Sequence, residues 1–105
     1  MVEIPATIRD TIAKYIRALK ENNVDVNRAV LFGSYAKGNY SEWSDIDLAV
    51  VSSAFEGNWI KDRKKIRAIT LSISSDIQAL PYRPEDFVPE DPFVKEILET
   101  GIQLH

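Results

Sequence analysis

The acidic pair Asp45 and Asp47, separated by one isoleucine, is the part of this sequence whose residue types and spacing most clearly suggest chemistry. Alternate residues of a strand project from one face, roughly 6.5–7 Å apart, so both carboxylates would lie side by side. Neighbouring carboxylates repel each other and are costly to ionise unless a cation lies between them. Mg²⁺ takes one or two carboxylates together with substrate phosphates, and two such ions can hold the attacking and leaving oxygens of a displacement at phosphorus. The pair therefore predicts a magnesium site for phosphate chemistry.

The dipeptide Gly33-Ser34, which ten residues separate from Asp45, is typical of a phosphate-binding turn. A glycine after a strand allows the backbone to approach a ligand closely. Ser34 begins a short helical segment, where free N–H groups and a hydroxyl can hold phosphate oxygens. Lys37 adds a positive charge to the same loop. This half of the hairpin suits a triphosphate, and the carboxylate half suits the metal ions that neutralise it.

These residues must be positioned by the surrounding elements, which apolar periodicity and chain breakers predict in the order helix, strand, turn, strand, helix, strand, helix. The helices are expected at 6–22, at 59–73 and in a short segment containing Phe93. The strands are expected at 26–32, 45–51 and 76–80, the last ended by Pro81, with a small edge strand at 102–104.

The connections between the expected strands predict how the sheet is built. The long helix between the second and third strands is a right-handed crossover, so these two strands should be parallel neighbours. The short connection between the first two strands predicts an antiparallel pair. The fold class is therefore α/β (α+β), a small mixed sheet flanked by helices, and the length of 105 residues favours a single domain over 1–105.

Asp76 begins the third expected strand, beside the strand that carries the acidic pair. The crossover brings the starts of these two strands together, so Asp76 would project near the same edge, where a carboxylate can act as general base. The alternative is that Asp76 caps the local turn formed with Ser74 and Ser75. The residues alone leave both interpretations open.

At these positions the sequence resembles the minimal nucleotidyltransferases of the DNA polymerase β superfamily. Their pattern is Gly-Ser, ten residues, Asp-x-Asp and a later acidic residue on the next strand, and this chain matches it with LFGSYAKG, SDIDLAVV and Asp76. The similarity covers nearly the whole chain. Where family members often carry arginine before the glycine, this chain has Lys37, which keeps the charge but lacks the two-pronged guanidinium.

The resemblance implies a polymerase β palm-like fold and a specific set of site residues. The implied catalytic carboxylates, which would also bind two Mg²⁺ ions, are Asp45, Asp47 and Asp76. The residues implied to bind the nucleoside triphosphate are Gly33, Ser34, Lys37 and Ser44.

The resemblance also implies a function, the transfer of a nucleoside monophosphate from a nucleoside triphosphate, with ATP expected, to a hydroxyl. Many small members are antitoxin partners of HEPN-domain ribonuclease toxins, and some modify a tyrosine of the partner with AMP. We therefore expect a HEPN-domain partner and an antitoxin role. A non-catalytic antitoxin subunit is the alternative, although pure binding has no need for two adjacent carboxylates. A phosphoacceptor signalling domain would need a longer five-strand alternation.

Composition excludes several other classes of site. The chain has no cysteine and one histidine, His105, which excludes disulfides, a cysteine zinc site, a thiol nucleophile and a Ser-His-Asp triad. A net charge of −3 argues against a nucleic acid as the main partner. Neither a signal peptide nor a membrane span is evident, so we expect a cytoplasmic protein without a membrane partner.

Three further features outside the motif carry expectations about packing. The basic cluster at 61–67 is expected to be a solvated helix face, with binding of RNA or of an acidic partner as the less favoured alternative. Trp43 is expected to pack over its loop rather than to stack on a base. Trp59 is expected in the core.

Overall fold

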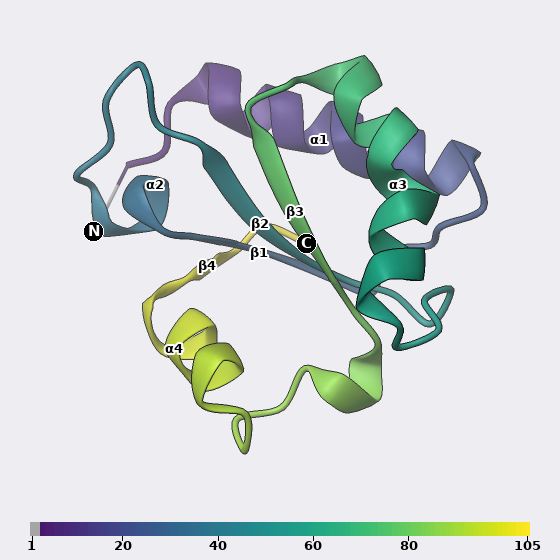
Figure 1. The fold of residues 1–105 in the computed structure, drawn as a ribbon. Coiled ribbons are helices and arrows are strands. Elements are labelled where there is room, and N and C mark those ends of the chain that lie inside the picture. Colours follow the sequence, from purple (N-terminus) through teal and green to yellow (C-terminus); the bar gives the residue numbers. More distant parts are fainter. Residues whose placement is uncertain (1–2) are drawn as a thin grey trace.

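A mixed four-stranded sheet with the order β3-β2-β1-β4 forms the centre of the structure, a computed structural model that describes residues 3–105 (Figure 1). The strands are β1 (Arg28–Phe32), β2 (Ile46–Val51), β3 (Ile77–Tyr82) and β4 (Ile102–Gln103). β1 pairs antiparallel with β2 and β4, and β2 pairs parallel with β3. The predicted α/β class and both predicted pairing directions are confirmed.

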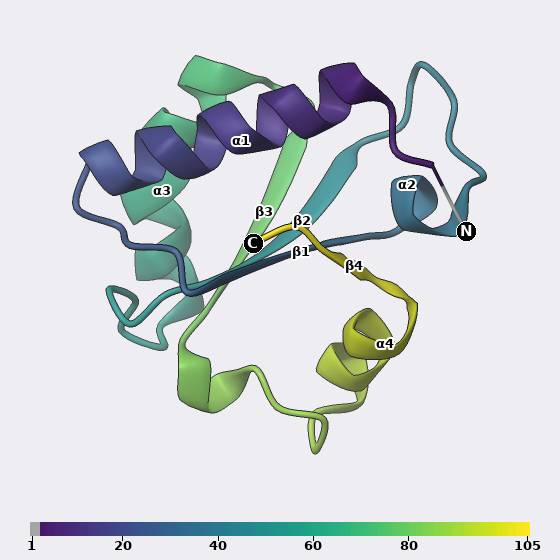
Figure 2. The same cartoon turned by 180° about the vertical axis from the view of Figure 1, so that it is seen from behind.

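Helices cover the two faces of this sheet unequally. The long helices α1 (Ala6–Glu21) and α3 (Trp59–Ile73) lie together on one face, whereas the shorter α4 (Pro92–Thr100) lies on the other (Figures 1 and 2). The single-turn helix α2 (Ser34–Lys37) follows β1 directly, and a 3₁₀ turn, η1 (Pro84–Asp86), follows β3. None of the helices in residues 3–105 is long and apolar enough to span a membrane.

The side chains of β2 alternate between two apolar layers. Ile46, Leu48 and Val50 join the core under α1 and α3, and Ala49 and Val51 join a smaller core under α4. Burial on both faces explains the uninterrupted apolar run at the end of this strand. Asp47 is the next residue on that face toward the start of β2, and it is half-buried. An acidic side chain thus stands where a further apolar one would extend the smaller core. The acidic pair thus lies on the α4 side of the sheet, at the start of β2.

Hydrogen bonds fix the helices to each other and to their loops. The hydroxyl groups of Tyr15 on α1 and Thr70 on α3 lie 2.6 Å apart in the buried interface, and burial raises the pKa of Tyr15 to about 12. Asp62 on α3 is 2% exposed because its carboxylate accepts the backbone N–H groups of Glu56 and Gly57, both at 2.9 Å. The charged pattern of 59–73 gave no sign that its single acidic residue, Asp62, closes the preceding loop.

Three sequence expectations are wrong. Trp59 is 47% exposed and Trp43 is 86% exposed, so neither packs as expected. β3 does not end at Pro81 but continues to Tyr82. Proline is tolerated there because β3 is an edge strand, where a missing N–H leaves no neighbouring strand without a partner.

Candidate functional site

The turn after β1 presents backbone groups at one end of the sheet. Gly33 has φ 74° and ψ −150°, a conformation that only glycine adopts readily, and it redirects the chain into α2. Its carbonyl accepts the N–H groups of Ala36 and Lys37, at 3.1 and 3.0 Å. Within the described residues, the N–H groups of Ser34 and Tyr35 and the hydroxyl of Ser34 make no hydrogen bond. These donors are free for a ligand.

The second half of the site comes from β2, which runs antiparallel to β1. In this register Asp47 lies opposite Phe32, next to the Gly33 turn. A methyl group on Gly33 would collide with Oδ2 of Asp47, so the carboxylate rests directly on the glycine backbone. The glycine is therefore required twice, once by its backbone angles and once by the acidic side chain beside it.

The two carboxylates of the motif have different surroundings. Asp45 precedes β2 and is exposed, whereas Asp47 is half-buried. Burial raises the pKa of Asp47, and the negative charge of Asp45 raises it further. Holding both groups ionised therefore costs free energy unless a cation lies between them.

Asp76 lies where the predicted crossover puts it. The register pairs Ile46 with Ile77 and Asp47 with Gln78, so Asp76 sits beside Asp45 on the same face of the sheet. Its carbonyl accepts the N–H of Ile46 at 2.8 Å. The carboxylate makes no hydrogen bond within residues 3–105, and the local cap is Ser74, whose Oγ accepts the Asp76 N–H at 3.1 Å. The alternative in which Asp76 caps the turn therefore loses its support.

The donor set fits a magnesium ion that arrives with a nucleotide. Within residues 3–105, no three histidine, cysteine or acidic side chains lie close enough together to hold a metal by themselves. Mg²⁺ needs only one or two carboxylates when substrate phosphates complete its shell, and Asp45 and Asp47 supply such a pair. Asp76 as a metal ligand stays a prediction.

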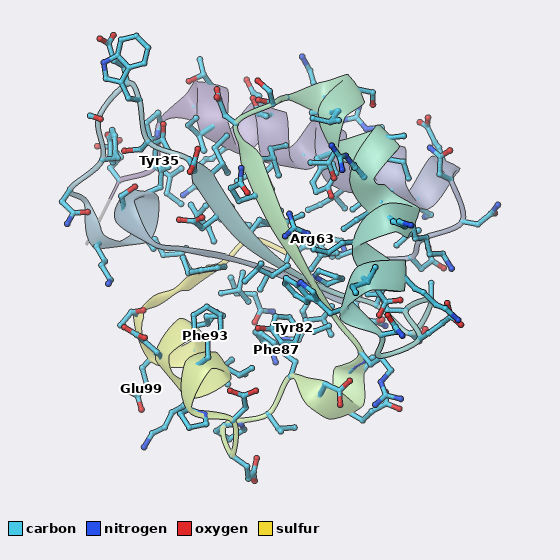
Figure 3. All side chains as sticks on the ribbon, viewed as in Figure 1. Tyr35, Arg63, Tyr82, Phe87, Phe93 and Glu99 are labelled. Carbon is cyan, nitrogen blue, oxygen red and sulfur yellow. The ribbon has the colours of Figure 1, made fainter. Side chains whose placement is uncertain are left out.

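The remaining predicted nucleotide-binding residues fall into two places. Lys37 borders a hollow of about 160 Å³ together with Gly33 and with Phe93 of α4. The half-exposed ring of Phe93 packs edge-on against Phe32, with ring centroids 6.0 Å apart (Figure 3). No sequence pattern indicated that Phe93 would lie beside Gly33 and Lys37. The Oγ of Ser44 accepts the N–H of Ser41 at 2.8 Å and so closes a turn before the acidic pair.

Comparison with known proteins identifies the family. A family model described as a nucleotidyltransferase domain matches residues 12–103. The chain belongs to this nucleotidyltransferase family. A Methanocaldococcus jannaschii protein named a "putative protein adenylyltransferase" is 31% identical over 81 residues, which cover 75% of this chain and 79% of the relative. The chain is accordingly a nucleotidyltransferase enzyme, as the sequence pattern predicts.

Solved structures show the same fold. A chain in a crystal structure of a toxin–antitoxin with AMP-PNP superimposes with a TM-score of 0.64 at 25% identity, covering 92% of this chain and 72% of that chain. A chain of the mutant toxin–antitoxin MntA-HpeT gives a TM-score of 0.62 at 24% identity, covering 89% and 71% of the two chains.

The Gly33–Asp47 contact predicts that Gly33→Ala destabilises the protein more than the matched change Gly57→Ala. Both glycines have a positive φ, 74° and 84°, but a methyl group at Gly57 meets only the flexible end of Arg83. Backbone strain costs of order 1–3 kcal/mol, and the collision with Asp47 adds roughly 1–3 kcal/mol of overpacking. Urea denaturation measures both losses. Equal losses would mean that Asp47 does not rest on Gly33.

The surroundings of Asp47 predict that its carboxyl titrates above its ordinary value of 3.8. Asp45→Asn should lower the pKa of Asp47 only part of the way, because burial is the larger cause. Carboxyl-carbon NMR titration measures this, with exposed Asp25→Asn as control. Since the folded-state pKa is raised, the stability contributed by protonated Asp47 is full below about pH 3.8 and lost as pH rises through the folded pKa. An Asp47 that titrates normally would contradict the account.

Proposed function

We propose that this enzyme transfers AMP from ATP to a hydroxyl group, with the nucleotide held between the Gly33 turn and the acidic pair. The observation that carries the proposal is the Gly33–Asp47 contact, which brings free backbone donors and a pair of neighbouring carboxylates to one place. Support for ATP comes from the likeness to a protein solved with AMP-PNP, and support for adenylyl transfer from the relative's name.

Each side of the site has a separate task in binding. The free N–H groups and the hydroxyl of the Gly33-Ser34 turn hold phosphate oxygens, and Lys37 adds a positive charge beside them. Ser44 shapes the turn that leads into the acidic pair and keeps its hydroxyl proton for a ligand. Asp45 and Asp47 would hold two Mg²⁺ ions. The bound ions would neutralise phosphate charge and lower the pKa of the attacking hydroxyl.

Asp76 completes the reaction as the general base. The acceptor oxygen forms a bond to the α-phosphorus, and the bond from that phosphorus to the bridging oxygen breaks. Pyrophosphate leaves with the electron pair, and the hydroxyl proton passes to the Asp76 carboxylate. This carboxylate is exposed and makes no hydrogen bond within the described chain, so it is free to accept a proton.

The acceptor is a hydroxyl, in our proposal a tyrosine, of a partner HEPN-domain toxin, whose modification makes this chain an antitoxin. The likeness to two toxin–antitoxin structures supports this role. The open face of the sheet supports it as well, because the exposed carboxylates of Asp45 and Asp76 can be reached by a protein side chain. Co-purification from the native host tests the partnership. A monomer that modifies a small-molecule acceptor unaided would contradict it.

Calorimetry with ATP tests the metal and nucleotide site directly. ATP should bind in the presence of Mg²⁺ and lose most of its affinity in EDTA, because the carboxylates repel the triphosphate when no cation separates them. Asp45→Asn combined with Asp47→Asn should abolish transfer, with a melting temperature that is unchanged or slightly higher, since the repulsion disappears. Asp10→Asn combined with Asp25→Asn is the matched control for charge. Equal ATP binding in EDTA would contradict the metal role, and a large drop in melting temperature would make the pair structural.

Asp76→Asn should spare ATP binding and lower the transfer rate by roughly 10²–10⁴-fold, the contribution of general-base catalysis. Ser74→Ala is the matched control, because it removes the hydroxyl that caps the same turn and leaves the carboxylate in place. It should cost about 0.5–2 kcal/mol of stability and keep transfer near normal. The assay follows label from ATP labelled at the α-phosphate into protein. Near-normal transfer by Asp76→Asn would remove Asp76 from the active site.

A further inference from the structure

A hollow lies between α3 and the outer edge of β3. It has a volume of about 510 Å³ and is lined by one side of α3 and by Ile77, Gln78 and Ala79 of β3. Figure 3 shows Arg63 reaching from α3 toward this strand. We call this hollow the α3–β3 groove. The proposed transfer reaction uses none of the α3 residues that line it.

One wall of the α3–β3 groove is an unpaired strand edge. The carbonyls of Asp76 and Tyr82 accept N–H groups from Ile46 and Ser52, at 2.8 and 2.9 Å, so the even-numbered residues of β3 face β2. The backbone groups of the odd-numbered residues, Ile77, Ala79 and Pro81, therefore point away from the sheet. The N–H groups of Ile77 and Ala79 have no partner within residues 3–105. An extended segment can pair here and would end at Pro81, which has no N–H.

The opposite wall carries positive charge that nothing in the described structure neutralises. Arg63, Lys64 and Arg67 line the groove, and no acidic residue does. None of the three forms an ion pair within residues 3–105. A chain with 16 acidic and 13 basic residues thus concentrates unpaired cations in one hollow.

Several apolar side chains next to these cationic residues are exposed to solvent. Ile60 is 68% exposed and Leu71 is 56% exposed, although both lie on the groove side of α3. Trp59 is 47% exposed, and the guanidinium carbon of Arg63 lies over its ring, 5.4 Å from the centroid. Exposed apolar groups beside unpaired backbone donors are the features of a surface that another chain covers.

We infer that the α3–β3 groove binds an extended acidic segment of a partner protein, which adds to the outer edge of β3 with its carboxylates facing Arg63 and Arg67. The unpaired N–H groups of Ile77 and Ala79 favour a peptide backbone over a nucleic acid, because they match the spacing of a strand. The ring of Trp59 is already covered by Arg63, which leaves it less free to stack on a base. The inference does not depend on the proposed adenylyl transfer.

Synthetic ten-residue peptides of alternating valine and glutamate test the groove, with valine–lysine peptides as the charge-reversed probe. NMR of ¹⁵N-labelled protein should show shifts of the Ile77 and Ala79 amides, and slower hydrogen exchange there, with the glutamate peptide only. Arg63→Glu combined with Arg67→Glu should weaken glutamate-peptide binding about tenfold or more, because two attractive charges become repulsive. The matched control is Lys14→Glu with Arg17→Glu on the exposed surface of α1, which makes the same change in charge and should bind normally.

Ala79→Pro tests strand addition separately, because it removes one outward N–H and no hydrogen bond to β2. It should weaken binding of the glutamate peptide while Arg63 and Arg67 remain in place. If this variant does not fold, the charge reversal still decides the inference. Unchanged binding by the charge-reversed variant, or binding without shifts at Ile77 and Ala79, would overturn it. Oligouridylate that shifts these amides and displaces the glutamate peptide would overturn it in favour of RNA.

Discussion

Asp47 rests its carboxylate on the backbone of Gly33 where β1 ends and β2 runs back beside it. This contact requires a residue without a side chain at one position and an acid at the other, and the antiparallel register of the two strands holds them together. The free backbone donors of the Gly33 turn and the repelling carboxylates of Asp45 and Asp47 thereby become two sides of one site. A triphosphate with its cation complements both sides, since it brings negative charge to the donors and positive charge to the carboxylates.

The unequal cover of the sheet makes this site accessible. α1 and α3 bury one face with long apolar side chains, among them Tyr15 and Ile66, and provide most of the core. On the other face α4 packs over the smaller core, which takes Val30 from β1 and Ala49 and Val51 from β2, and the next position of β2 toward its start holds the carboxylate of Asp47. The parallel pairing with β3 adds Asp76 at the same edge. The larger core and the acidic pair therefore lie on opposite faces of one short strand.

Local patterns in the sequence were sufficient to predict the order of the elements, the direction of both main strand pairings and the place of Asp76. These features depend on periodicity, on glycine and proline, and on the handedness of one crossover. Features that depend on a residue's place in the folded sheet or on the conformation of a loop were missed. Pro81 fits inside a strand only because β3 is at the edge, and Asp62 is buried because a loop turns two N–H groups toward it. Trp59 was expected in the core, but it lines the α3–β3 groove and its side chain stays partly exposed there.

A crystal structure with α,β-methylene ATP and Mn²⁺ as a visible substitute for Mg²⁺ would test the central claim most directly. Anomalous scattering locates the manganese independently of the protein coordinates. Our account predicts a manganese peak in contact with the carboxylates of Asp45 and Asp47, and phosphate oxygens within hydrogen-bond distance of the Ser34 N–H. A manganese peak remote from both carboxylates, or a triphosphate bound away from the Gly33 turn, would contradict it.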